Sequence, residues 1–368
     1  MKTIVLTGGG TAGHIIPNIA LLPTLKQHFD NIVYIGSGAD IEKNLLSNYS
    51  YVKYYAIPTT KLRRSLNLTN ITIPFRLHKG VSKSKELLQQ IKPDVIFSKG
   101  GYVALPVVLA GAKLNVPMLA HESDYTLGLA NKLVKNKFSV ICTTFEPTAE
   151  KLKNGVYVGP IIRDDITKGN ALNFKKQFGL TSKKPVLLVL GGSQGAEQIN
   201  KLIWDNLNTL TKTHQVVHLC GKGKQNKNIQ NPDYYQLEFY NKMQDIYACV
   251  DLCITRGGSN TIFELLANHI PMMIIPLQKG SRGDQVQNAK YFESHNYALS
   301  VLDKKIDNHI FITAWNTLKA RAKLIRASTK NFDTSCAIQR IYKEMNKIMN
   351  IDNNTTQKHQ TLVQSKTL

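Results

Sequence analysis

Two segments of this chain repeat one plan, and the repeat limits the folds open to the chain more than any other feature. Residues 94–120 and 252–275 each read as an apolar strand, a turn of one basic residue and two glycines, a helix, a hydrophobic residue with a proline, and a second strand. The turns are KGG at 99–101 and RGG at 256–258. Strands that alternate with helices at this spacing are typical of parallel sheets with helical connections.

A second pair of segments extends the repeat to the start of each half. The strand at 3–6 runs into the glycine loop TGGGTAGH, and the strand at 186–190 runs into GGSQG. The chain therefore predicts an α/β fold of two similar, doubly wound parallel-sheet domains that face a cleft. Its 368 residues are enough for two domains of ordinary size.

The repeat breaks between residues 155 and 168, where a Gly-Pro pair and a charged run interrupt the pattern. We expect an N-terminal domain over 1–160 and a C-terminal domain over 161–333. Residues 334–350 carry apolar side chains at helical intervals and predict a helix that packs back on the N-terminal domain. Residues 351–368 are polar and weakly patterned, so we expect them to be disordered.

The glycine turns predict where a ligand binds. In doubly wound parallel sheets, ligands lie beyond the carboxyl ends of the strands, and each of these turns follows a strand. Gly8, Gly10 and Gly13 match the GxGxxG pattern of dinucleotide sites, but GSG at 36–38 stands where that fold places a ribose-binding carboxylate. We therefore expect a phosphate-bearing ligand other than NAD.

The segment 255–289 carries polar groups suited to a sugar nucleotide. Helix starts present unpaired N–H groups and favour anions. Glu264, one to two turns into the first helix, can accept two hydrogen bonds from a diol, and Asp284 with Gln285 can bind sugar hydroxyls. The simpler interpretation of Glu264 is a solvated carboxylate on a helix surface.

The net charge narrows the choice of partners. Lys and Arg number 47 against 25 Asp and Glu, which gives +22 and attracts phosphates in a nucleic acid, a membrane surface or a small diphosphate ligand. A basic surface that only keeps the protein soluble is the simpler interpretation. We expect no nucleic-acid binding, because the basic residues are spread out without interleaved stacking aromatics or a familiar binding module.

Residues 61–85 mix basic and apolar side chains and allow two interpretations. One is a helix whose apolar face joins the core. The other is a peripheral patch on an anionic membrane surface, to which each Lys or Arg contributes on the order of 1 kcal/mol. No uninterrupted apolar run reaches about 18 residues, so we do not expect the chain to span a membrane. The patch would consist of Ile71, Ile73, Phe75 and Arg76.

Six motifs in one order resemble those of the MurG family of peptidoglycan N-acetylglucosaminyltransferases. They start at Gly8, Lys99, His121, Gly191, Arg256 and Gly283 and read GGGTAGHIIP, KGGYVALP, HESDYTLGLAN, GGSQGAEQIN, RGGSNTIFEL and GDQVQNA. The resemblance covers residues 1 to about 349. It implies a GT-B fold and the inverting transfer of GlcNAc from UDP-GlcNAc to the 4-hydroxyl of MurNAc in undecaprenyl-diphospho-MurNAc-pentapeptide, which converts lipid I to lipid II.

The resemblance also implies a role for each half. The C-terminal half would bind UDP-GlcNAc and the N-terminal half the lipid-linked acceptor. This places the chain at the cytoplasmic face of a bacterial cell membrane, as a peripheral protein that acts with other cell-wall synthesis proteins in cell shape and division. The implied donor residues are Arg163, Ser193, Gln194, Glu264, Asp284 and Gln285, with Thr11 and Gly13 of the first glycine loop. The implied acceptor residues are Thr11, His14, Tyr102, His121, Glu122 and Asp124.

Glycosyl transfer needs a base for the acceptor hydroxyl and positive groups for the departing UDP. We favour His14 as the base, because an imidazole titrates near neutrality and His14 directly follows the glycine loop. Glu122 and Asp124 are its rivals, although many family members have Asn where Asp124 stands. Because no DxD motif lies near the pocket, we expect Arg163, helix N-termini and backbone N–H groups to stabilise the leaving group without a bound metal.

Simpler structural interpretations remain beside these roles. His14 and His121 would then be structural hydrogen-bond donors, and Tyr102 a packing aromatic. A different enzyme of the same fold, such as a UDP-sugar:diacylglycerol transferase or a UDP-GlcNAc epimerase, is the second functional interpretation. The KGGY and HESD segments disfavour it, because they should diverge for another acceptor.

Overall fold

A computed structural model describes residues 1–60, 73–180, 183–192, 195–278, 283–333 and 336–364, with side chains to residue 350. The chain forms two compact units: unit 1 is Met1–Ile161 with Ser335–Leu368, and unit 2 is Ile162–Thr334. The chain passes from unit 1 to unit 2 between Ile161 and Ile162, inside the predicted break at 155–168.

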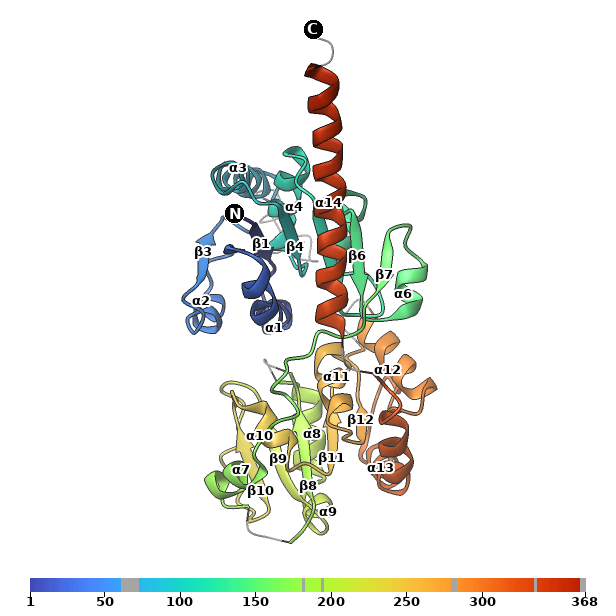
Figure 1. Cartoon of the computed structure of the whole chain (residues 1–368). Coiled ribbons are helices and arrows are strands. Elements are labelled where there is room, and N and C mark those ends of the chain that lie inside the picture. The colour runs from blue at the N-terminus through green and yellow to red at the C-terminus, as the bar shows by residue number, and fades with distance from the viewer. Residues whose placement is uncertain (61–72, 181–182, 193–194, 279–282, 334–335, 365–368) are drawn as a thin grey trace. The chain divides into compact units, whose positions relative to one another are not determined.

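Unit 1 is built on a seven-stranded sheet in the order β3-β2-β1-β4-β5-β6-β7, and its neighbouring strands are parallel (Figure 1). Ile4 and Leu6 of β1 join one core cluster and Val5 joins another, because successive side chains of a strand point to opposite faces. The strands are β1 (Thr3–Thr7), β2 (Asn31–Gly36), β3 (Val52–Ala56), β4 (Val95–Ser98), β5 (Met118–Glu122), β6 (Val140–Thr143) and β7 (Gly155–Tyr157).

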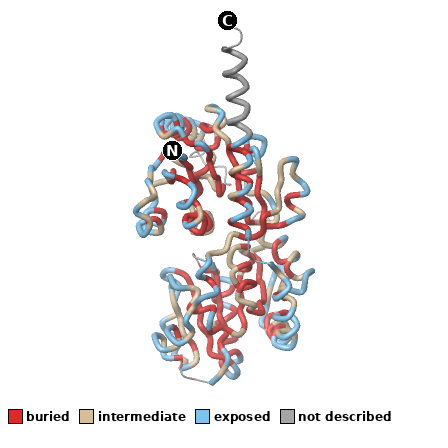
Figure 2. The backbone as a smooth tube through the Cα atoms, viewed as in Figure 1, coloured by how far each residue is buried: buried red, intermediate tan, exposed pale blue. Residues whose placement is uncertain are grey.

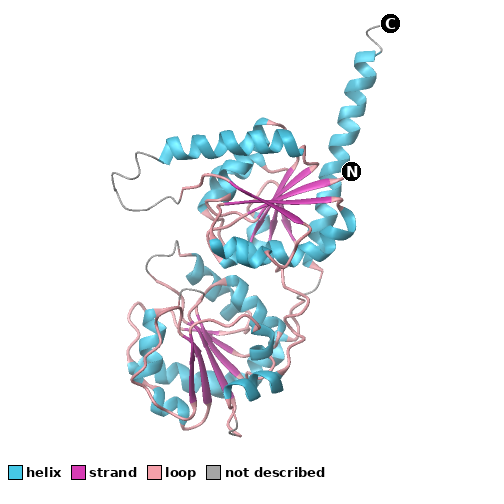
Figure 3. Ribbon diagram, turned by 90° about the vertical axis from the view of Figure 1, so that its left-hand side faces the viewer, coloured by secondary structure: helices cyan, strands magenta, loops and turns pink. Residues whose placement is uncertain are grey.

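Helices cover both faces of this sheet (Figure 3). They are α1 (Ala12–His28), α2 (Asp40–Leu46), α3 (Ile73–Ile91), α4 (Ala104–Lys113), α5 (Leu129–Val134), the short 3₁₀ helix η2 (Lys135–Lys137), α6 (Glu146–Glu150) and α14 (Ala337–Gln364).

Helix α14 packs on unit 1 beside α1. Ile338, Ile341 and Met345 lie in the same buried cluster as Leu22 of α1, and the ring of Tyr342 stacks on His28 at a centroid distance of 4.0 Å. The sequence predicts a helix over 334–350 and disorder beyond it, whereas helix α14 continues to Gln364. Extending a formed helix requires no new nucleation, so a polar sequence can continue a helix that began on a packed surface.

Unit 2 holds a six-stranded sheet in the order β10-β9-β8-β11-β12-β13, and its neighbouring strands are also parallel. Figure 2 shows buried strands and more exposed outer turns in both units. The strands are β8 (Val186–Leu190), β9 (Gln215–Leu219), β10 (Tyr234–Leu237), β11 (Leu252–Thr255), β12 (Met272–Ile274) and β13 (Leu299–Ser300). The helices are α7 (Ala171–Phe178), α8 (Glu197–Asp205), α9 (Leu207–Thr211), α10 (Met243–Tyr247), α11 (Ser259–Ala267), α12 (Asp284–Ser294) and α13 (Asn308–Thr329).

Each sheet reverses its direction of growth at one point. The chain goes from β1 outward through β2 and β3 and then returns to place β4 on the other side of β1; β8 is flanked by β9 and β11 in the same way. The predicted two doubly wound parallel sheets are confirmed. Ligands of such sheets bind where the strand order reverses, so the loops after β1 and β4, and those after β8 and β11, mark the functional edge of each unit.

Candidate active site

The first glycine loop places Thr11 and His14 beyond the carboxyl end of β1. Thr11 precedes α1 with an extended backbone, and its side chain makes no capping hydrogen bond to the helix. Its hydroxyl oxygen Oγ1 lies 2.9 Å from Nδ1 of His14 instead. This contact engages one ring nitrogen and orients the imidazole at the functional edge of unit 1.

The glycine turn after β4 closes against this loop. A Cβ atom built on Gly101 would lie 2.7 Å from the carbonyl oxygen of Gly9 and 3.5 Å from ring atoms of His14. A Cβ on Gly10 would overlap the phenol ring of Tyr102. The two turns therefore need glycine for their close approach, and Tyr102 packs on the first loop. His14 and Tyr102 are brought to the same edge, as predicted, and Tyr102 has the packing role that was its simpler interpretation.

His121 lies inside unit 1. It belongs to β5, is 0% exposed, and has its Nε2 atom 3.3 Å from the hydroxyl oxygen of Thr144. Burial, with the nearby charge of Lys99, holds the pKa of His121 well below its ordinary value, so the ring is neutral. Among the described residues, Nδ1 of this buried ring has no hydrogen-bond partner. The contact between His121 and the acceptor stays a prediction.

Glu122 anchors the loop that follows β5. Its carboxylate accepts hydrogen bonds from the backbone N–H of Asp124 at 3.2 Å and of Gly128 at 2.7 Å, and from Nδ2 of Asn131 at 3.0 Å. Burial and the neighbouring Asp124 raise its pKa. Since three donors already occupy this buried carboxylate, the structure does not support Glu122 as the base. It fixes the loop that carries Asp124.

Lys99 ties the KGG turn to the same loop. Its side chain is 3% exposed, and its ammonium nitrogen donates to the hydroxyl of Ser123 at 2.7 Å. Burial lowers the pKa of Lys99, and the carboxylates of Glu122 and Asp124 oppose this effect. The turn after β4 and the loop after β5 thus form one connected polar cluster, and Asp124 is held at its edge.

In unit 2, Glu264 of α11 stands beside two partners. Tyr247 of α10 donates its hydroxyl to Oε2 of Glu264 at 2.8 Å. Arg163 contributes a nearby positive charge. Its buried Nε atom has no hydrogen-bond partner among the described residues and lies 3.7 Å from Oδ1 of Asp165. Burial raises the pKa of Glu264, and both Tyr247 and Arg163 oppose that rise. The structure therefore places Arg163 and Glu264, two of the predicted donor residues, near each other.

The RGG turn after β11 meets the start of α12. The guanidinium Nη1 of Arg256 donates to the carbonyl oxygen of Gly191 at 3.4 Å, and its charge interacts with Asp284. A Cβ on Gly257 would lie 2.6 Å from the carbonyl oxygen of Gln285, whose side-chain oxygen accepts from the N–H of Leu277 at 3.0 Å. The turn and the helix start are thus locked together, and they bring Asp284 and Gln285 to the functional edge of unit 2.

Some predicted residues lie outside the described part of the chain: these are Ser193, Gln194 and Ile71. Their neighbours are described. Gly195 has a positive φ of 69°, and a side chain there would overlap the carbonyl oxygen of Cys220. The loop after β8 therefore passes close to the end of β9 and depends on glycine.

Helix α3 carries the later part of the basic and apolar segment and has a packed part and an exposed start. Its later part packs on α4 through buried side chains that include Val81, Leu87 and Leu88. Its first turns are open: Phe75 is 64% exposed, and the ammonium nitrogen of Lys79 lies 4.9 Å from the centre of its ring. Arg76 is exposed and Ile73 is half-buried. No helix in the described residues is both long and apolar enough to cross a bilayer.

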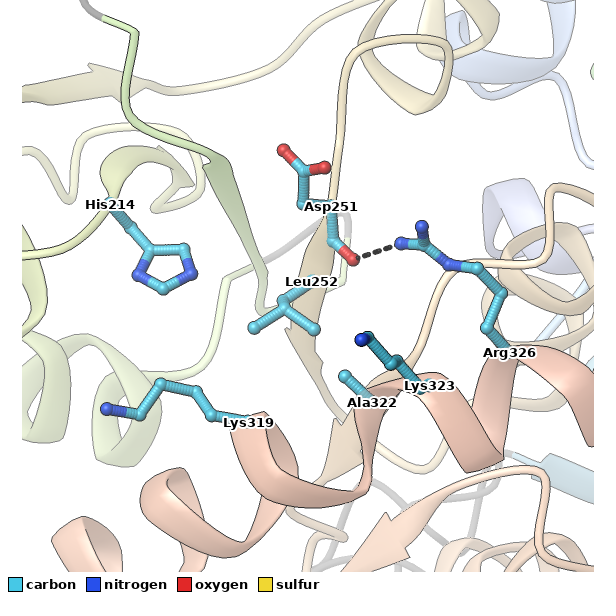
Figure 4. Close-up of a pocket in the computed structure, with 7 residues that line it drawn as sticks. All are labelled: His214, Asp251, Leu252, Lys319, Ala322, Lys323 and Arg326. Atoms are coloured by element: carbon cyan, nitrogen blue, oxygen red, sulfur yellow. Dashed lines mark hydrogen bonds between the residues drawn. The ribbon is translucent and has the colours of Figure 1, made fainter.

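A hollow of about 310 Å³ lies at the other edge of the unit 2 sheet (Figure 4). His214 precedes β9 and Asp251 precedes β11, so the hollow lies at the amino ends of the strands. Arg326 donates to the carbonyl oxygen of Asp251 at 2.9 Å. This bond holds α13 against the sheet. We therefore interpret the hollow as a gap in the packing between α13 and the sheet. The lining residues are His214, Asp251, Leu252, Lys319, Ala322, Lys323 and Arg326.

Tyr247 and Asn131 contact candidate site residues, although the sequence motifs assign no role to either of them. Tyr247 lies 17 positions before Glu264 in a short helix without a glycine motif. Asn131 closes the HESDYTLGLAN motif but gave no sign that it contacts Glu122. The one sequence signal for the contact between Tyr247 and Glu264 is the position of Tyr247, shortly before the strand that leads into the RGG turn.

Comparison with known proteins identifies the family. Residues 4–142 match the glycosyltransferase family 28 N-terminal domain, and residues 186–346 match the glycosyltransferase family 28 C-terminal domain. The chain is 41% identical over 350 residues to UDP-N-acetylglucosamine–N-acetylmuramyl-(pentapeptide) pyrophosphoryl-undecaprenol N-acetylglucosamine transferase 2 of Bacillus cereus, which covers 94% of this chain and 99% of that protein. An enzyme of the same name without the number, from Oceanobacillus iheyensis, is 41% identical over 95% of this chain and 99% of its own length.

Solved structures share the fold. MurG of Acinetobacter baumannii aligns with a TM-score of 0.73 at 21% identity over 94% of this chain and 100% of its own. The UDP-GlcNAc 2-epimerase of Neisseria meningitidis aligns with a TM-score of 0.66 at 14% identity, over 94% of this chain and 100% of its own. These likenesses confirm the expected GT-B architecture but do not separate a transferase from an epimerase. The full-length sequence relatives do: the chain is a glycosyltransferase of family 28 and belongs to the MurG family.

Proposed function

We propose that this enzyme transfers GlcNAc from UDP-GlcNAc to the 4-hydroxyl of MurNAc in undecaprenyl-diphospho-MurNAc-pentapeptide, in peptidoglycan synthesis. The observation that carries the proposal is the identity of 41% over 99% of the length of a relative with that name. The polar clusters at the functional edges of both units support it, because each consists of groups that the reaction needs.

Unit 2 would bind the donor. Glu264 accepts hydrogen bonds from the ribose hydroxyls, and Arg163 together with the first turns of α11 and α12 meets the diphosphate. Asp284 and Gln285 contact the GlcNAc hydroxyls. Among the described residues, the buried Nε of Arg163 has an ion pair with Asp165 at 3.7 Å but no hydrogen-bond partner. This supports the role, because a hydrogen bond to an anionic oxygen stabilises a buried guanidinium nitrogen.

Unit 1 would bind the acceptor and supply the base. His14 takes the proton of the MurNAc 4-hydroxyl, whose oxygen attacks the anomeric carbon while the bond from that carbon to the UDP oxygen breaks. The electron pair of the broken bond leaves on the diphosphate, next to Arg163. The Thr11 hydroxyl supports the assignment to His14, because its contact with Nδ1 orients the imidazole at the functional edge of unit 1. Asp124 is the remaining rival base.

The enzyme would act as a peripheral protein at the cytoplasmic face of the cell membrane. The exposed start of α3, with Phe75 and Arg76, supports attachment to an anionic surface, and the net charge of +22 favours it. Phe75 would insert into the headgroup layer while basic side chains meet the lipid phosphates.

Transfer of label from radiolabelled UDP-GlcNAc tests the proposal directly. The full chain is given a soluble lipid I analogue in one reaction and diacylglycerol in another. We expect label only in the muramoyl product. Label in the glycerolipid alone would refute the proposal in favour of the diacylglycerol transferase, and conversion of UDP-GlcNAc to its C2 epimer without transfer would favour the epimerase.

A further inference from the structure

Tyr247 is buried beside the carboxylate that the donor would use. The residue is 3% exposed, and its hydroxyl donates to Oε2 of Glu264 at 2.8 Å. In the described residues, the other oxygen, Oε1, accepts no hydrogen bond. Glu264 is therefore held by one oxygen, and the other remains available as an acceptor.

The short helix α10 that carries Tyr247 is fixed in place by the segment that carries Arg163. The carboxylate of Asp245 accepts from the N–H of Asn170 at 2.7 Å. A Cβ atom on Gly169 would overlap the carbonyl oxygen of Gln244, so the two backbones touch. Helix α10 therefore contacts both the segment that follows Arg163 and the side chain of Glu264. These contacts fix the position of Tyr247 relative to both.

The charged and titratable groups that face Glu264 are Tyr247, Arg163 and Asp165. Burial raises the pKa of the carboxyl group, and Asp165 adds to the rise. The Tyr247 hydrogen bond and the positive charge of Arg163 lower it. The ionised form, which accepts hydrogen bonds from hydroxyls, thus depends in part on Tyr247.

We propose that Tyr247 is a positioning residue for the ribose end of the donor: its hydroxyl holds Oε2 of Glu264 so that the carboxylate presents Oε1 to the ribose diol. The inference rests on the proposed function, in which unit 2 takes UDP-GlcNAc. It adds a residue that touches no substrate and acts through Glu264.

The test compares the affinities of the full chain for UDP and for 2′-deoxy-UDP, measured by calorimetry. Tyr247→Phe removes only the hydroxyl, and Tyr235→Phe is the matched control, because it removes a tyrosine hydroxyl bonded to Gly179 elsewhere in unit 2. We expect Tyr247→Phe to lose about tenfold in affinity for UDP and less for 2′-deoxy-UDP, so its preference for the ribose falls. Tyr235→Phe should keep the wild-type preference.

Two further readouts separate positioning from a general loss of structure. As pH falls, UDP affinity of Tyr247→Phe should begin to decline at a higher pH than that of the wild type, because the carboxyl group then takes up a proton more readily. Glu264→Gln should lose the ribose preference by itself, and adding Tyr247→Phe to it should cause no further loss. This double variant keeps the test decisive when Tyr247→Phe alone lowers the unfolding temperature.

The outcomes distinguish the inference from the proposed function. A wild-type enzyme that prefers UDP over 2′-deoxy-UDP, together with a Tyr247→Phe variant of the same preference, would overturn the inference and leave the function intact. A wild-type enzyme that neither binds UDP nor transfers from UDP-GlcNAc would overturn the proposed function, and the inference with it.

Discussion

The hydroxyl oxygen of Thr11 lies 2.9 Å from Nδ1 of His14, and this contact orients the imidazole. If His14 is the base, His14→Ala should lower kcat about 100-fold at saturating donor and acceptor, because a positioned base contributes roughly that factor. Initial rates over a range of both substrates provide the measurement. The donor KM should change little, since donor binding is assigned to unit 2.

Two variants serve as controls for this result. Thr11→Val removes the orienting hydroxyl and should lower kcat by a smaller factor than His14→Ala. Asp124→Asn should retain most of the rate. An unaltered kcat in His14→Ala, with a large loss in Asp124→Asn, would assign the base to Asp124.

His218 provides a prediction about stability and pH. Burial lowers its pKa to about 3, so the folded enzyme keeps the ring neutral while the unfolded chain takes up a proton below pH of about 6.5. The unfolded state then binds more protons, and the free energy of unfolding falls with falling pH. This single group should remove about 2 kcal/mol between pH 7 and pH 5, measured by urea denaturation.

His218→Gln should reduce this pH-dependent loss by a similar amount, even if it also lowers stability at pH 7 by disturbing the bonds to Tyr234 and Asn200. His309→Gln is the matched control, because His309 is exposed at the start of α13. Equal losses in His218→Gln and wild type would mean that His218 does not govern the acid sensitivity.

The role of a residue could be predicted where it follows from a single sequence motif. It could not be predicted where it depends on contacts between residues that are distant in the sequence. The family resemblance assigned both Glu264 and Arg163 to the donor, and in the structure the charge of Arg163 acts on Glu264. Glu122 fits the pattern of a base equally well in sequence, but its three hydrogen-bond donors become visible only when the loop closes over it. The full burial of His121 could not be predicted from its motif, because it depends on the helices that cover both faces of the sheet.

We propose that helix α3 attaches the enzyme to an anionic membrane surface. Replacing Ile73, Phe75 and Arg76 together with Ser should reduce its sedimentation with vesicles that contain anionic lipid, because the variant loses an exposed aromatic ring and a positive charge. Transfer to a soluble acceptor analogue should persist, since these side chains lie outside the polar clusters.

Phe239→Ser is the matched control, because Phe239 is 60% exposed in unit 2. It should leave sedimentation unchanged. If the α3 variant sediments as much as the wild type, the start of α3 is not a membrane contact. The helix then has only its packing role against α4.

Most elements could be predicted because their apolar runs are short, buried and bounded by glycine or proline. The strands expected at 186–190 and 252–255 agree with β8 and β11 residue for residue. The short helix α10 was not predicted, since five residues carry too little periodicity. The extent of α14 was misjudged because a polar sequence does not reveal whether a preceding packed helix continues through it.

At the scale of the whole molecule, the repeat in the sequence corresponds to two sheets that reverse at equivalent strands, β1 and β8. This shared architecture explains why glycine turns recur at the functional edges of both units. The architecture does not specify the reaction, because an epimerase has the same fold. The reaction was predictable only from the six motifs together.

The transfer reaction of the whole enzyme should not require a divalent metal ion. We propose that Arg163 and the starts of α11 and α12 stabilise the departing UDP, so transfer should continue unchanged in EDTA after removal of divalent cations. Rates measured before and after chelation provide the check. Loss of activity that Mg²⁺ restores would require a metal in the mechanism.

The anomeric configuration of the product tests the central claim most directly. The donor carries GlcNAc in the α configuration, and a single displacement driven by a base inverts it. Proton NMR of the product from UDP-GlcNAc and a soluble lipid I analogue should reveal a β linkage to the 4-hydroxyl of MurNAc. An α linkage, or attachment to any other hydroxyl, would contradict the account.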